Sequence, residues 1–375
     1  MNNAKPKKPN VVIIGGGVVG CAAAWRLAKK GAQVTVLERS IPGAEASSAA
    51  AGILGAQVES HHPGPMAELS LKSRSYFSNW ARDLLRETGV DIGYREGGVI
   101  RAAFSDKEGK KSQKEAVWQR KLGLKVAILR KRDLLQLEPE LSPTLVAGLH
   151  YEGDARIDPV LFSRALHLAA QRAGVRFVSG APVRTICEAE GKVTGVSLED
   201  GQAVSANVVV VAAGSWTSQI GGLGIASDSV RPARGQIVEL LHPERLLQRI
   251  VFGPNCYVVP RDDGRLLVGS TLEFAGYHKA VTAGAVAQLL TAAIALVPRV
   301  KDATLSQTWS NFRPFTEDEL PLLGKGAIQG LVFASGHYRN GILLAPVSAE
   351  AVVSLVFGGK APLDLAPFNP FRSHG

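Results

Sequence analysis

The sequence has few cysteines and no long apolar segment, which excludes several classes of protein. Its three cysteines, Cys21, Cys187 and Cys256, have the spacing of neither a metal site nor a redox pair. No uninterrupted apolar run reaches the roughly 18 residues that a membrane-spanning helix needs. We therefore expect packed thiols in a reducing compartment, and a cytoplasmic protein.

The patterns that identify hydrolases and metalloenzymes are also missing. The sequence shows no Ser–His–Asp set, no paired carboxylates and no metal-ligand spacing, and no internal repeat or low-complexity linker interrupts it. The pair His61-His62 lies in the Pro/Gly segment HHPGP, so we expect it to face solvent. With 375 residues, 46% of them hydrophobic, the chain can form a large core and more than one domain.

The net charge of +10 is concentrated in one segment. Ten lysines and arginines lie between Lys107 and Arg132, opposed there only by Glu108 and Glu115. The segment has few aromatic residues to stack on bases, which argues against nucleic-acid binding. We expect a solvated face, and the alternative is contact with an anionic membrane or an acidic redox partner.

A glycine-rich segment near the start carries the clearest signal. In VVIIGGGVVGCAAAWRLAKKGAQVTVLERS (11–40), a β-branched run precedes Gly15, Gly17 and Gly20 at G-x-G-x-x-G spacing. A predicted helix follows, and then a second strand that ends at Glu38. The first glycine permits a tight turn, the second lets the backbone approach a pyrophosphate, and the third lets the helix pack closely. Because Glu38 can bind a ribose diol, this order predicts dinucleotide binding.

The sequence contains one well-formed fingerprint of this kind, which favours FAD over NAD. A flavin enzyme that is reduced by NAD(P)H commonly carries two, whereas a single site fits a flavin that is reduced directly by its substrate. In GAEASSAAAGIL (43–54), Ser47 and Ser48 offer hydroxyls, and the small residues 49–52 leave room for a cofactor. An ordinary alanine-rich helix is the alternative for this segment.

Further elements follow from local patterns. The segment 89–104 is typical of paired strands, and 158–174 of a helix with Asp158 as its N-cap and Gly174 at its end. NVVVVAAG (207–214) predicts a buried strand that ends in small residues beneath a nucleotide. CYVVPRDDGRLLVGSTLEF (256–274) predicts a hairpin that turns at Asp263-Gly264, with Arg261 and Arg265 solvated. A helix over 283–298 would cover one face of the resulting sheet.

Four segments together resemble the FAD-dependent D-amino acid oxidase superfamily, in particular its glycine oxidase (ThiO-like) branch linked to thiamine synthesis. They are VIIGGGVVG with Glu38, GAEASSAAAGIL, CYVVPRDDGRLLVGST, and FRPFTEDELPLLG followed by FASGHYRNGILLAPVSAEAV. The resemblance implies an α/β (α+β) fold with a discontinuous Rossmann-like FAD-binding domain and an inserted antiparallel-sheet domain for the substrate. We expect the first domain to comprise 9–88, 153–228 and 308–370, and the second 89–152 and 229–307.

The resemblance and the fingerprint assign residues to the cofactor and the substrate. Arg313 matches the family's carboxylate-binding arginine, Tyr257 a tyrosine at the same carboxylate, and Arg339 a second arginine beside the flavin. The sarcosine-oxidase branch anchors its flavin through a C-terminal cysteine, but residues from 312 onward contain none, so we expect non-covalent FAD. The predicted cofactor residues are Gly15, Gly17, Val18, Val19, Gly20, Glu38, Arg39, Ser47, Ser48, Ala51, Gly52, Val183, Ala213, Gly214, Trp216, His337, Tyr338, Arg339, Asn340, Gly341 and Ile342.

The C-terminal segment predicts a buried helix with a role at the flavin. Proline is best tolerated in a first helical turn, so Pro346 predicts a start near Leu344–Ala345 and a helix that runs to Phe357. Glu350 is the only charge in that run. The partial positive charge of the helix N-terminus would stabilise an anionic reduced flavin.

The implied reaction is oxidation of the C–N bond of glycine or a similarly small amino acid, such as sarcosine or D-alanine. Hydride transfer to flavin N5 would give an imine, then an oxo acid and ammonia, with O₂ as acceptor and H₂O₂ as product. The first alternative is a D-amino acid dehydrogenase that passes electrons to a quinone or partner protein. The second is a flavin-binding subunit without turnover, which would not need a carboxylate clamp. We also expect a homo-oligomer.

Overall fold

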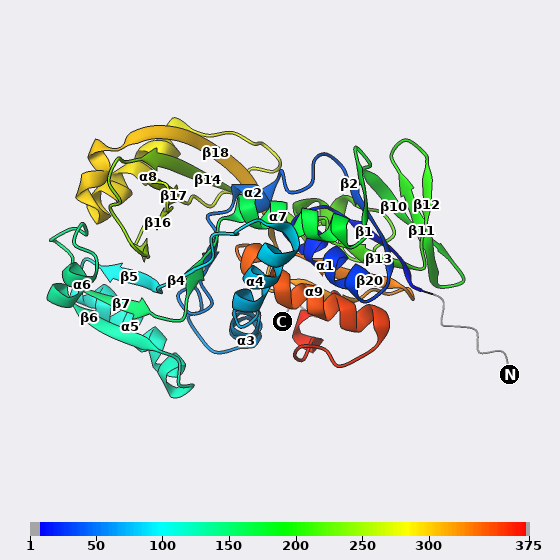
Figure 1. The fold of residues 1–375 in the computed structure, drawn as a ribbon, viewed down its shortest axis with the longest axis horizontal. Helices are drawn as coiled ribbons and strands as arrows, with labels where there is room; N and C mark the ends of the chain where they lie inside the picture. Colours follow the sequence, from blue (N-terminus) through cyan, green and yellow to red (C-terminus); the bar gives the residue numbers. More distant parts are fainter. Residues whose placement is uncertain (1–7, 373–375) are drawn as a thin grey trace.

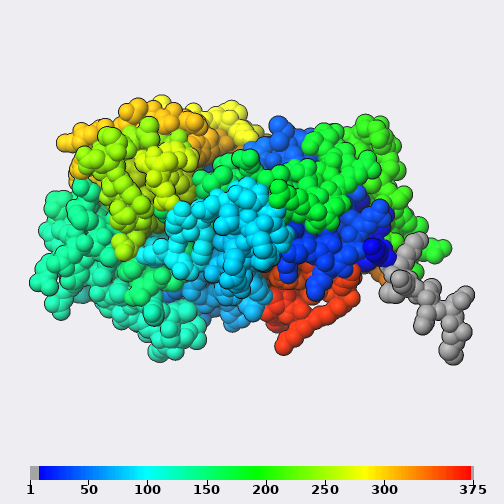
Figure 2. Space-filling model, viewed as in Figure 1, coloured from blue at the N-terminus to red at the C-terminus, as the bar shows by residue number. Residues whose placement is uncertain are grey.

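The structure, a computed structural model, describes residues 8–372 and is built around two large sheets (Figure 1). One is a six-stranded sheet with helices on one face, and the other is an eight-stranded, mostly antiparallel sheet. Their elements alternate along the chain, so each sheet is assembled from distant segments. In Figure 2 the two groups of segments occupy opposite ends of an elongated molecule.

The six-stranded sheet has the order β19-β20-β13-β1-β2-β9. All neighbours run parallel except β19, which is antiparallel to β20. Parallel strands are buried on both faces, which explains the continuous β-branched runs at 11–14 and 208–211. Its strands are β1 (Asn10–Ile14), β2 (Gln33–Glu38), β9 (Arg176–Ser179), β13 (Val208–Val211), β19 (Leu322–Lys325) and β20 (Leu331–Ser335).

Successive residues of β1 face opposite layers, as the pleat requires. Val11 and Ile13 pack among the helices, whereas Val12 and Ile14 pack against a small three-stranded sheet. The helices are α1 (Val18–Lys29), α3 (Pro65–Arg74), α4 (Phe77–Thr88), α7 (Pro159–Arg172) and α9 (Gly341–Phe357), and the small sheet comprises β10 (Val183–Ala189), β11 (Lys192–Leu198) and β12 (Ala203–Ser205).

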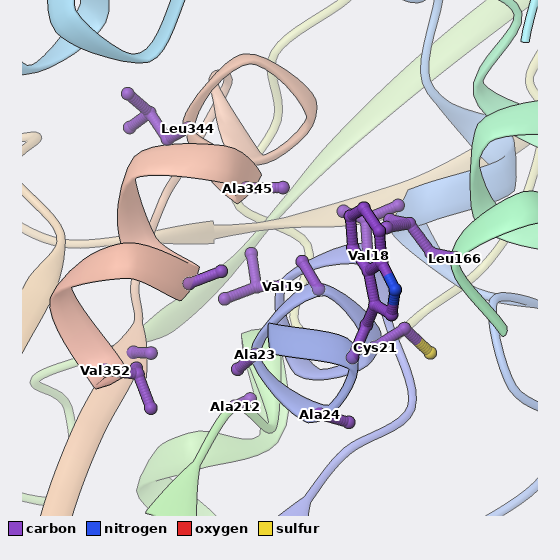
Figure 3. Packing of buried hydrophobic residues seen from close by; sticks show 14 of the residues in the cluster. Val18, Val19, Cys21, Ala23, Ala24, Leu166, Ala212, Leu344, Ala345 and Val352 are labelled. Atoms are coloured by element: carbon purple, nitrogen blue, oxygen red, sulfur yellow. The ribbon is translucent and has the colours of Figure 1, made fainter. Parts of the chain in front are cut away.

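Small side chains let α1 and α9 approach closely, which places the start of each helix beside the same site. Figure 3 shows Val19 and Ala23 of α1 directed toward α9, where Ala345 and Val352 lie. All four side chains are buried. Arg26 of α1 also pairs with Glu350 of α9 at 2.7 Å, so the only charged side chain within α9 has an ion-pair partner.

The eight-stranded sheet has the order β18-β14-β17-β16-β15-β5-β7-β6, with β15 and β5 as its single parallel pair within the described residues. Helix α8 (Ala283–Leu296) covers one face through Leu289, Ala293 and Leu296. The strands are β5 (Val99–Ala103), β6 (Val126–Arg130), β7 (Ala147–Tyr151), β14 (Arg231–Leu241), β15 (Ile250–Phe252), β16 (Tyr257–Pro260), β17 (Arg265–Gly269) and β18 (Thr304–Phe315).

The remaining elements connect the two sheets or cover their ends. The basic segment forms α5 (Asp106–Lys121), β6 and the start of α6 (Lys131–Leu137), and all ten of its lysines and arginines are exposed. Within residues 8–372 we find no helix with the length and hydropathy to cross a bilayer. The other elements are α2 (Ala46–Ala49), the strands β3 (Ile53–Leu54), β4 (Arg95–Glu96) and β8 (Ala155–Arg156), and the 3₁₀ turns η1 (Gly214–Gln219), η2 (Pro298–Asp302) and η3 (Ala366–Phe368).

The predicted pairing within 89–104 is wrong. Strands β4 and β5 form there, but β4 pairs with β8, and β5 pairs with β7 and β15. Gly97 and Gly98, which separate them, both have positive φ values. These glycines direct the chain from one sheet to another instead of closing a hairpin.

The start of the C-terminal helix also differs from the prediction. Helix α9 begins at Gly341, three residues earlier than expected, and Pro346 lies inside it. The buried hydroxyl of Ser73 donates to the carbonyl of Leu343 at 2.6 Å and accepts from the Val347 N–H at 3.2 Å. A side chain inserted in this way satisfies backbone groups that the proline disturbs, so the helix continues through it.

Arg261 is not solvated, which corrects a second expectation. Its side chain is buried at the turn between β16 and β17, and it donates to two backbone carbonyls, of Ile157 and Ala51. Arg265, in the same turn, is half-buried and pairs with Glu239 and Asp263. Alternation along the strand could not distinguish the two arginines, because the buried acceptors come from other segments.

Candidate active site

A cavity of about 590 Å³ lies between the two large sheets, at the carboxyl ends of the parallel strands. Open α/β sheets bind ligands at this edge, where the strands end and helices begin. The six-stranded sheet contributes residues such as Ile14, Leu37 and Ala212, and the eight-stranded sheet contributes Ile237 and others. The cavity therefore joins a nucleotide-binding edge to the face of an antiparallel sheet.

The glycine loop has the close contacts that a dinucleotide fingerprint requires. Gly15 has a φ of +105°, and a Cβ there would lie 2.5 Å from the carbonyl oxygen of Ala212. A Cβ on Gly20 would lie 2.0 Å from the Gly15 carbonyl oxygen, so this glycine permits close helix packing. Gly17 is the N-cap of α1 and faces the cavity, with only the Ser47 hydroxyl near its Cβ position.

Glu38 is held at the end of β2 with its carboxylate toward the glycine loop. The carboxylate accepts from the Gly16 N–H at 2.7 Å and from the Ser40 N–H at 2.9 Å. The side chain is buried but lines the cavity, where a ribose diol would meet a fixed acceptor. Beside it, the Arg39 guanidinium lies over the Trp216 ring at 3.4 Å, which gives the cavity a flat aromatic wall.

The segment 45–53 forms another wall of the cavity. Ser47 accepts from the Val18 N–H at 3.0 Å, which satisfies one free donor at the start of α1. Ser48 does not line the cavity, because its hydroxyl donates to the Glu45 carbonyl. Beyond α2, Ala49–Gly52 and Ile53 line the cavity with small side chains and backbone.

The start of α9 and the segment before it close the end of the cavity. His337 is buried, and its Nε2 lies 2.8 Å from the Ser348 hydroxyl of α9. Burial lowers the pKa of His337 to about 4, so the ring is neutral at physiological pH. Asn340 precedes α9 and makes no side-chain capping bond, which leaves the positive end of the helix dipole toward the cavity.

Arg313, on β18, lines the end of the cavity that the eight-stranded sheet forms. Its guanidinium donates to the Thr271 carbonyl at 3.1 Å and to the Ser270 hydroxyl at 2.5 Å. Burial lowers the pKa of Arg313, which nonetheless remains charged at neutral pH. Gly235 makes room for it, because a Cβ there would lie 2.3 Å from an Arg313 nitrogen.

Tyr257 and Arg339 line the same end. A Cβ on Gly269 would lie 2.4 Å from the Tyr257 hydroxyl, so a second glycine leaves space for a site side chain. The negative charge of Glu59 is the main influence that raises the pKa of Arg339. Tyr257 is buried, Arg313 and Glu59 are half-buried, and Arg339 is exposed, so these four side chains share a partly enclosed space that would hold a small carboxylate.

The structure brings the predicted site residues together around one cavity. All the predicted residues line it except Gly20 and Ser48, which lie directly behind the lining. Sequence analysis did not identify Glu59, Ser270 or Gly235. Glu59 lies in an irregular segment without a motif, and the importance of Gly235 appears only when Arg313 is placed beside it. Its position in RPARGQIVEL gave no signal of this contact.

The residues present fit a dinucleotide such as FAD. The glycine loop excludes side chains where a pyrophosphate would approach, α1 and α9 direct their N-termini at the cavity, and Glu38 offers an acceptor at the far end. The cavity volume lies within the range of about 300–1,000 Å³ that is typical of cofactor sites. The Arg313 end remains available for a second, small ligand.

Comparisons with known proteins agree with this architecture. A family model described as FAD dependent oxidoreductase (DAO) matches residues 10–355. The chain is 38% identical over 370 residues to a glycine oxidase of Geobacillus kaustophilus, a match that covers 98% of this chain and 97% of the relative. It is 36% identical to the bifunctional protein ThiO/ThiG of Nostoc sp., with 97% of this chain and 55% of that protein covered.

Solved structures give the same picture. The crystal structure of glycine oxidase from Geobacillus kaustophilus superposes with a TM-score of 0.93 at 37% identity, and the match covers 98% of this chain and 100% of that chain. Glycine oxidase from Bacillus cereus gives a TM-score of 0.89 at 33% identity, with 94% and 96% covered. These matches extend over both large sheets and the cavity between them.

Proposed function

Because the chain belongs to the DAO family of FAD-dependent oxidoreductases, we propose that it oxidises the amine of glycine or a similarly small amino acid. The observation that carries this proposal is the pairing of a dinucleotide cradle with the half-buried Arg313 in one cavity. Arg313 would bind the substrate carboxylate, because its planar fork matches both carboxylate oxygens. The glycine oxidases among the relatives support a small substrate.

Arg313 is prepared for a carboxylate by its own hydrogen bonds. Its bonds to Thr271 and Ser270 use two of the five N–H groups of the guanidinium and fix its orientation. Other N–H groups then remain for the ligand. A substrate anchored here would hold its α-carbon at a constant distance from the bound cofactor. The entropy of orienting the substrate would then be lost on binding and not in the reaction step.

The charges in the cavity favour a neutral substrate amine. Arg313 and Arg339 contribute two positive charges, and Glu59 and the substrate carboxylate would contribute two negative charges. An ammonium group would leave one uncompensated positive charge in this partly enclosed space, so the bound amine would lose a proton more readily. FAD, when bound, supplies the acceptor for the α-hydrogen as hydride at N5. The chain then needs to orient the amine and exclude water rather than provide a strong base.

The products follow from the bond that is oxidised. Loss of hydride gives an imine, which water hydrolyses to an oxo acid and ammonia, and O₂ as acceptor would be reduced to H₂O₂. We infer non-covalent FAD, because residues from 312 onward lack cysteine. The ThiO/ThiG names of three relatives support a place in thiamine synthesis for the oxidised product.

The product assay tests this proposal directly. Purified, FAD-loaded protein is incubated in air with glycine, sarcosine, D-alanine or D-proline, and peroxide is measured together with the organic products. These are an oxo acid and ammonia from glycine or D-alanine, an oxo acid and methylamine from sarcosine, and a cyclic imine from D-proline. The proposal predicts turnover of at least one of these amines, with equal amounts of peroxide and oxidised product. Turnover with an artificial electron acceptor but no peroxide would instead indicate a dehydrogenase. Absence of turnover with all four amines would reject the small-amino-acid assignment.

A further inference from the structure

Each of the two predicted substrate-binding side chains has a neighbour, four residues away in the sequence, that binds residues 49–52, a segment lining the cavity that we call the cofactor wall. On β18, Trp309 precedes Arg313 by four residues, and its indole N–H donates to the Ala49 carbonyl at 3.0 Å. Arg261 follows Tyr257 by four residues, directly after the end of β16, and donates to the Ala51 carbonyl at 2.9 Å. Within β18, a spacing of four places Trp309 and Arg313 on one face of the strand.

The two acceptors belong to a segment that lines the cofactor end of the cavity. Ala49 and Ala51 face the cavity, and Ala51 packs in one hydrophobic cluster with Ile237 and Tyr257. Arg261 also binds the Ile157 carbonyl at 2.8 Å, and the Ile157 N–H donates to the Gly52 carbonyl at 2.9 Å. The Arg261 guanidinium therefore holds the wall in two ways, directly through the Ala51 carbonyl and indirectly through Ile157, which binds Gly52.

Neighbouring groups hold the Arg261 turn in place. Asp262 pairs with Arg156 at 2.6 Å and with Arg95 at 2.9 Å, and Arg245 lies 3.6 Å from it. Arg156 belongs to β8, next to Ile157. The turn between β16 and β17 is thus joined to the small sheet as well as to the cofactor wall.

Arg261 is a costly choice if its only task is stability. It is a buried cation, and burial lowers its pKa to about 10, a value at which it is still charged at neutral pH. Its Nε has no hydrogen-bond partner among the described residues. Buried charges of this kind often contribute little to stability, and an apolar side chain can replace them. The planar fork nevertheless reaches two carbonyls from different segments at once, which an apolar side chain cannot do.

We propose that Arg261 and Trp309 are positioning residues that hold the 49–52 wall at a fixed distance from Tyr257 and Arg313. They act through the backbone of the wall and contact neither substrate nor cofactor. The inference rests on the proposed function, since it concerns the distance between the substrate-binding residues Tyr257 and Arg313 and a bound flavin. Loss of either side chain would let the wall move relative to the clamp while leaving both sets of binding residues intact.

The test compares FAD-loaded Arg261→Met, Arg261→Lys and Trp309→Phe with the wild type. Arg265→Gln is the matched control for the arginine, because Arg265 lies in the same turn and binds only carboxylates. Trp118→Phe is the control for the indole, since the Trp118 N–H has no partner within the described residues. Arg261→Lys and Trp309→Phe carry the test if Arg261→Met does not fold.

Three measurements separate positioning from general stability. Amide hydrogen exchange across 49–53 measures how mobile the wall is. The flavin difference spectrum on adding acetate depends on the position of the bound carboxylate relative to the flavin. The rate of anaerobic flavin reduction by saturating glycine depends on the orientation of the bound substrate. The proposal predicts faster exchange at 49–53, an altered acetate spectrum, and reduction slowed roughly tenfold to a hundredfold, with acetate affinity changed less than about threefold. The two controls should match the wild type.

The result that overturns the inference is a variant with lower thermal stability but wild-type exchange at 49–53, acetate spectrum and reduction rate. Failure of the proposed function would look different. In that case the wild type itself would not be reduced by glycine or the other amines, while the exchange and acetate measurements would still compare variants with controls.

Discussion

Two glycines leave the space in which the proposed substrate-binding side chains lie. Gly235 lies against the Arg313 guanidinium, and Gly269 against the Tyr257 hydroxyl. Neither has a positive φ, and what both provide is room for the neighbouring side chain. At this scale the site depends on residues that bear no functional group.

Gly235→Ala should displace the arginine without unfolding the protein. The new Cβ would lie 2.3 Å from an Arg313 nitrogen, at the far end of a flexible side chain that can move. We expect KM for glycine to rise about tenfold, equivalent to ~1.4 kcal/mol of binding, with FAD content unchanged. Steady-state kinetics checks this, and Gly284→Ala is the control, because nothing lies within 4 Å of its Cβ position. An unchanged KM would show that Arg313 does not bind the substrate.

His337 should make stability depend on pH in the acid range. Its pKa is about 4 in the folded protein, below the ordinary value of 6.5, so the unfolded chain binds the proton more readily. The neutral ring contributes stability above pH 6.5 that is lost as pH falls toward 4, at most about 3 kcal/mol. Burial raises the pKa of Asp154 to about 6, which acts in the opposite direction, so the comparison needs a variant.

The measurement is the free energy of unfolding of the wild type and of His337→Gln at pH 7 and pH 4.5. The wild type should lose more stability than the variant over this interval, because only the wild type has an imidazole at position 337. Equal losses in the two proteins would show that His337 is accessible to protons in the folded state.

Among the helices, α9 shows how a local sequence rule can be overridden by a tertiary contact. Pro346 suggested that the helix starts near residue 344, because proline is best tolerated in a first helical turn. The Ser73 hydroxyl from α3 instead bridges Leu343 and Val347 inside the helix. Nothing in the sequence around Ser73 indicates this contact, because the partner lies about 270 residues away.

Ser73→Ala should therefore destabilise the protein. Removing the hydroxyl takes away the hydrogen-bond acceptor of the buried Val347 N–H and the donor to the Leu343 carbonyl. We expect the free energy of unfolding to fall by about 1–3 kcal/mol. Chemical denaturation of the FAD-free protein measures the change. Ser75→Ala is the control, since the Ser75 hydroxyl is exposed and bonds only within its own turn. Equal stability of the two variants would contradict a bridging role for Ser73.

Across the whole molecule, sequence patterns predicted the family and its cofactor better than the arrangement of the parts. The glycine loop, Glu38 and the buried strands followed from local rules, because their backbone geometry depends on neighbouring residues. The burial of Arg261, the position of Glu59 and the partners of β4 and β5 depend on distant segments, and periodicity contains no such information. The strongest predictions were those for which one short segment fixes both the geometry and the ligand.

The division into domains is a proposal at the same scale. The expected boundary at 307–308 falls within β18, which pairs with β14 from Thr304 to Phe315. We propose that the substrate-binding domain extends to Phe315, with the remaining segments 9–88 and 153–228 and the residues after 315 forming the FAD-binding domain. Arg313 would then belong to the substrate domain, as its role requires.

One measurement tests the central claim that a flavin and an arginine clamp act together on a small amino acid. FAD-loaded wild type and Arg313→Met are mixed with glycine without oxygen, and loss of the oxidised flavin absorbance is followed. The wild type should bleach with glycine but not with methylamine, which lacks the carboxylate, and Arg313→Met should bleach at least about a hundredfold more slowly at limiting glycine, because about 3 kcal/mol of carboxylate binding is lost. Equal bleaching of wild type and variant with glycine, or no bleaching of the wild type with glycine, sarcosine, D-alanine or D-proline, would contradict the account.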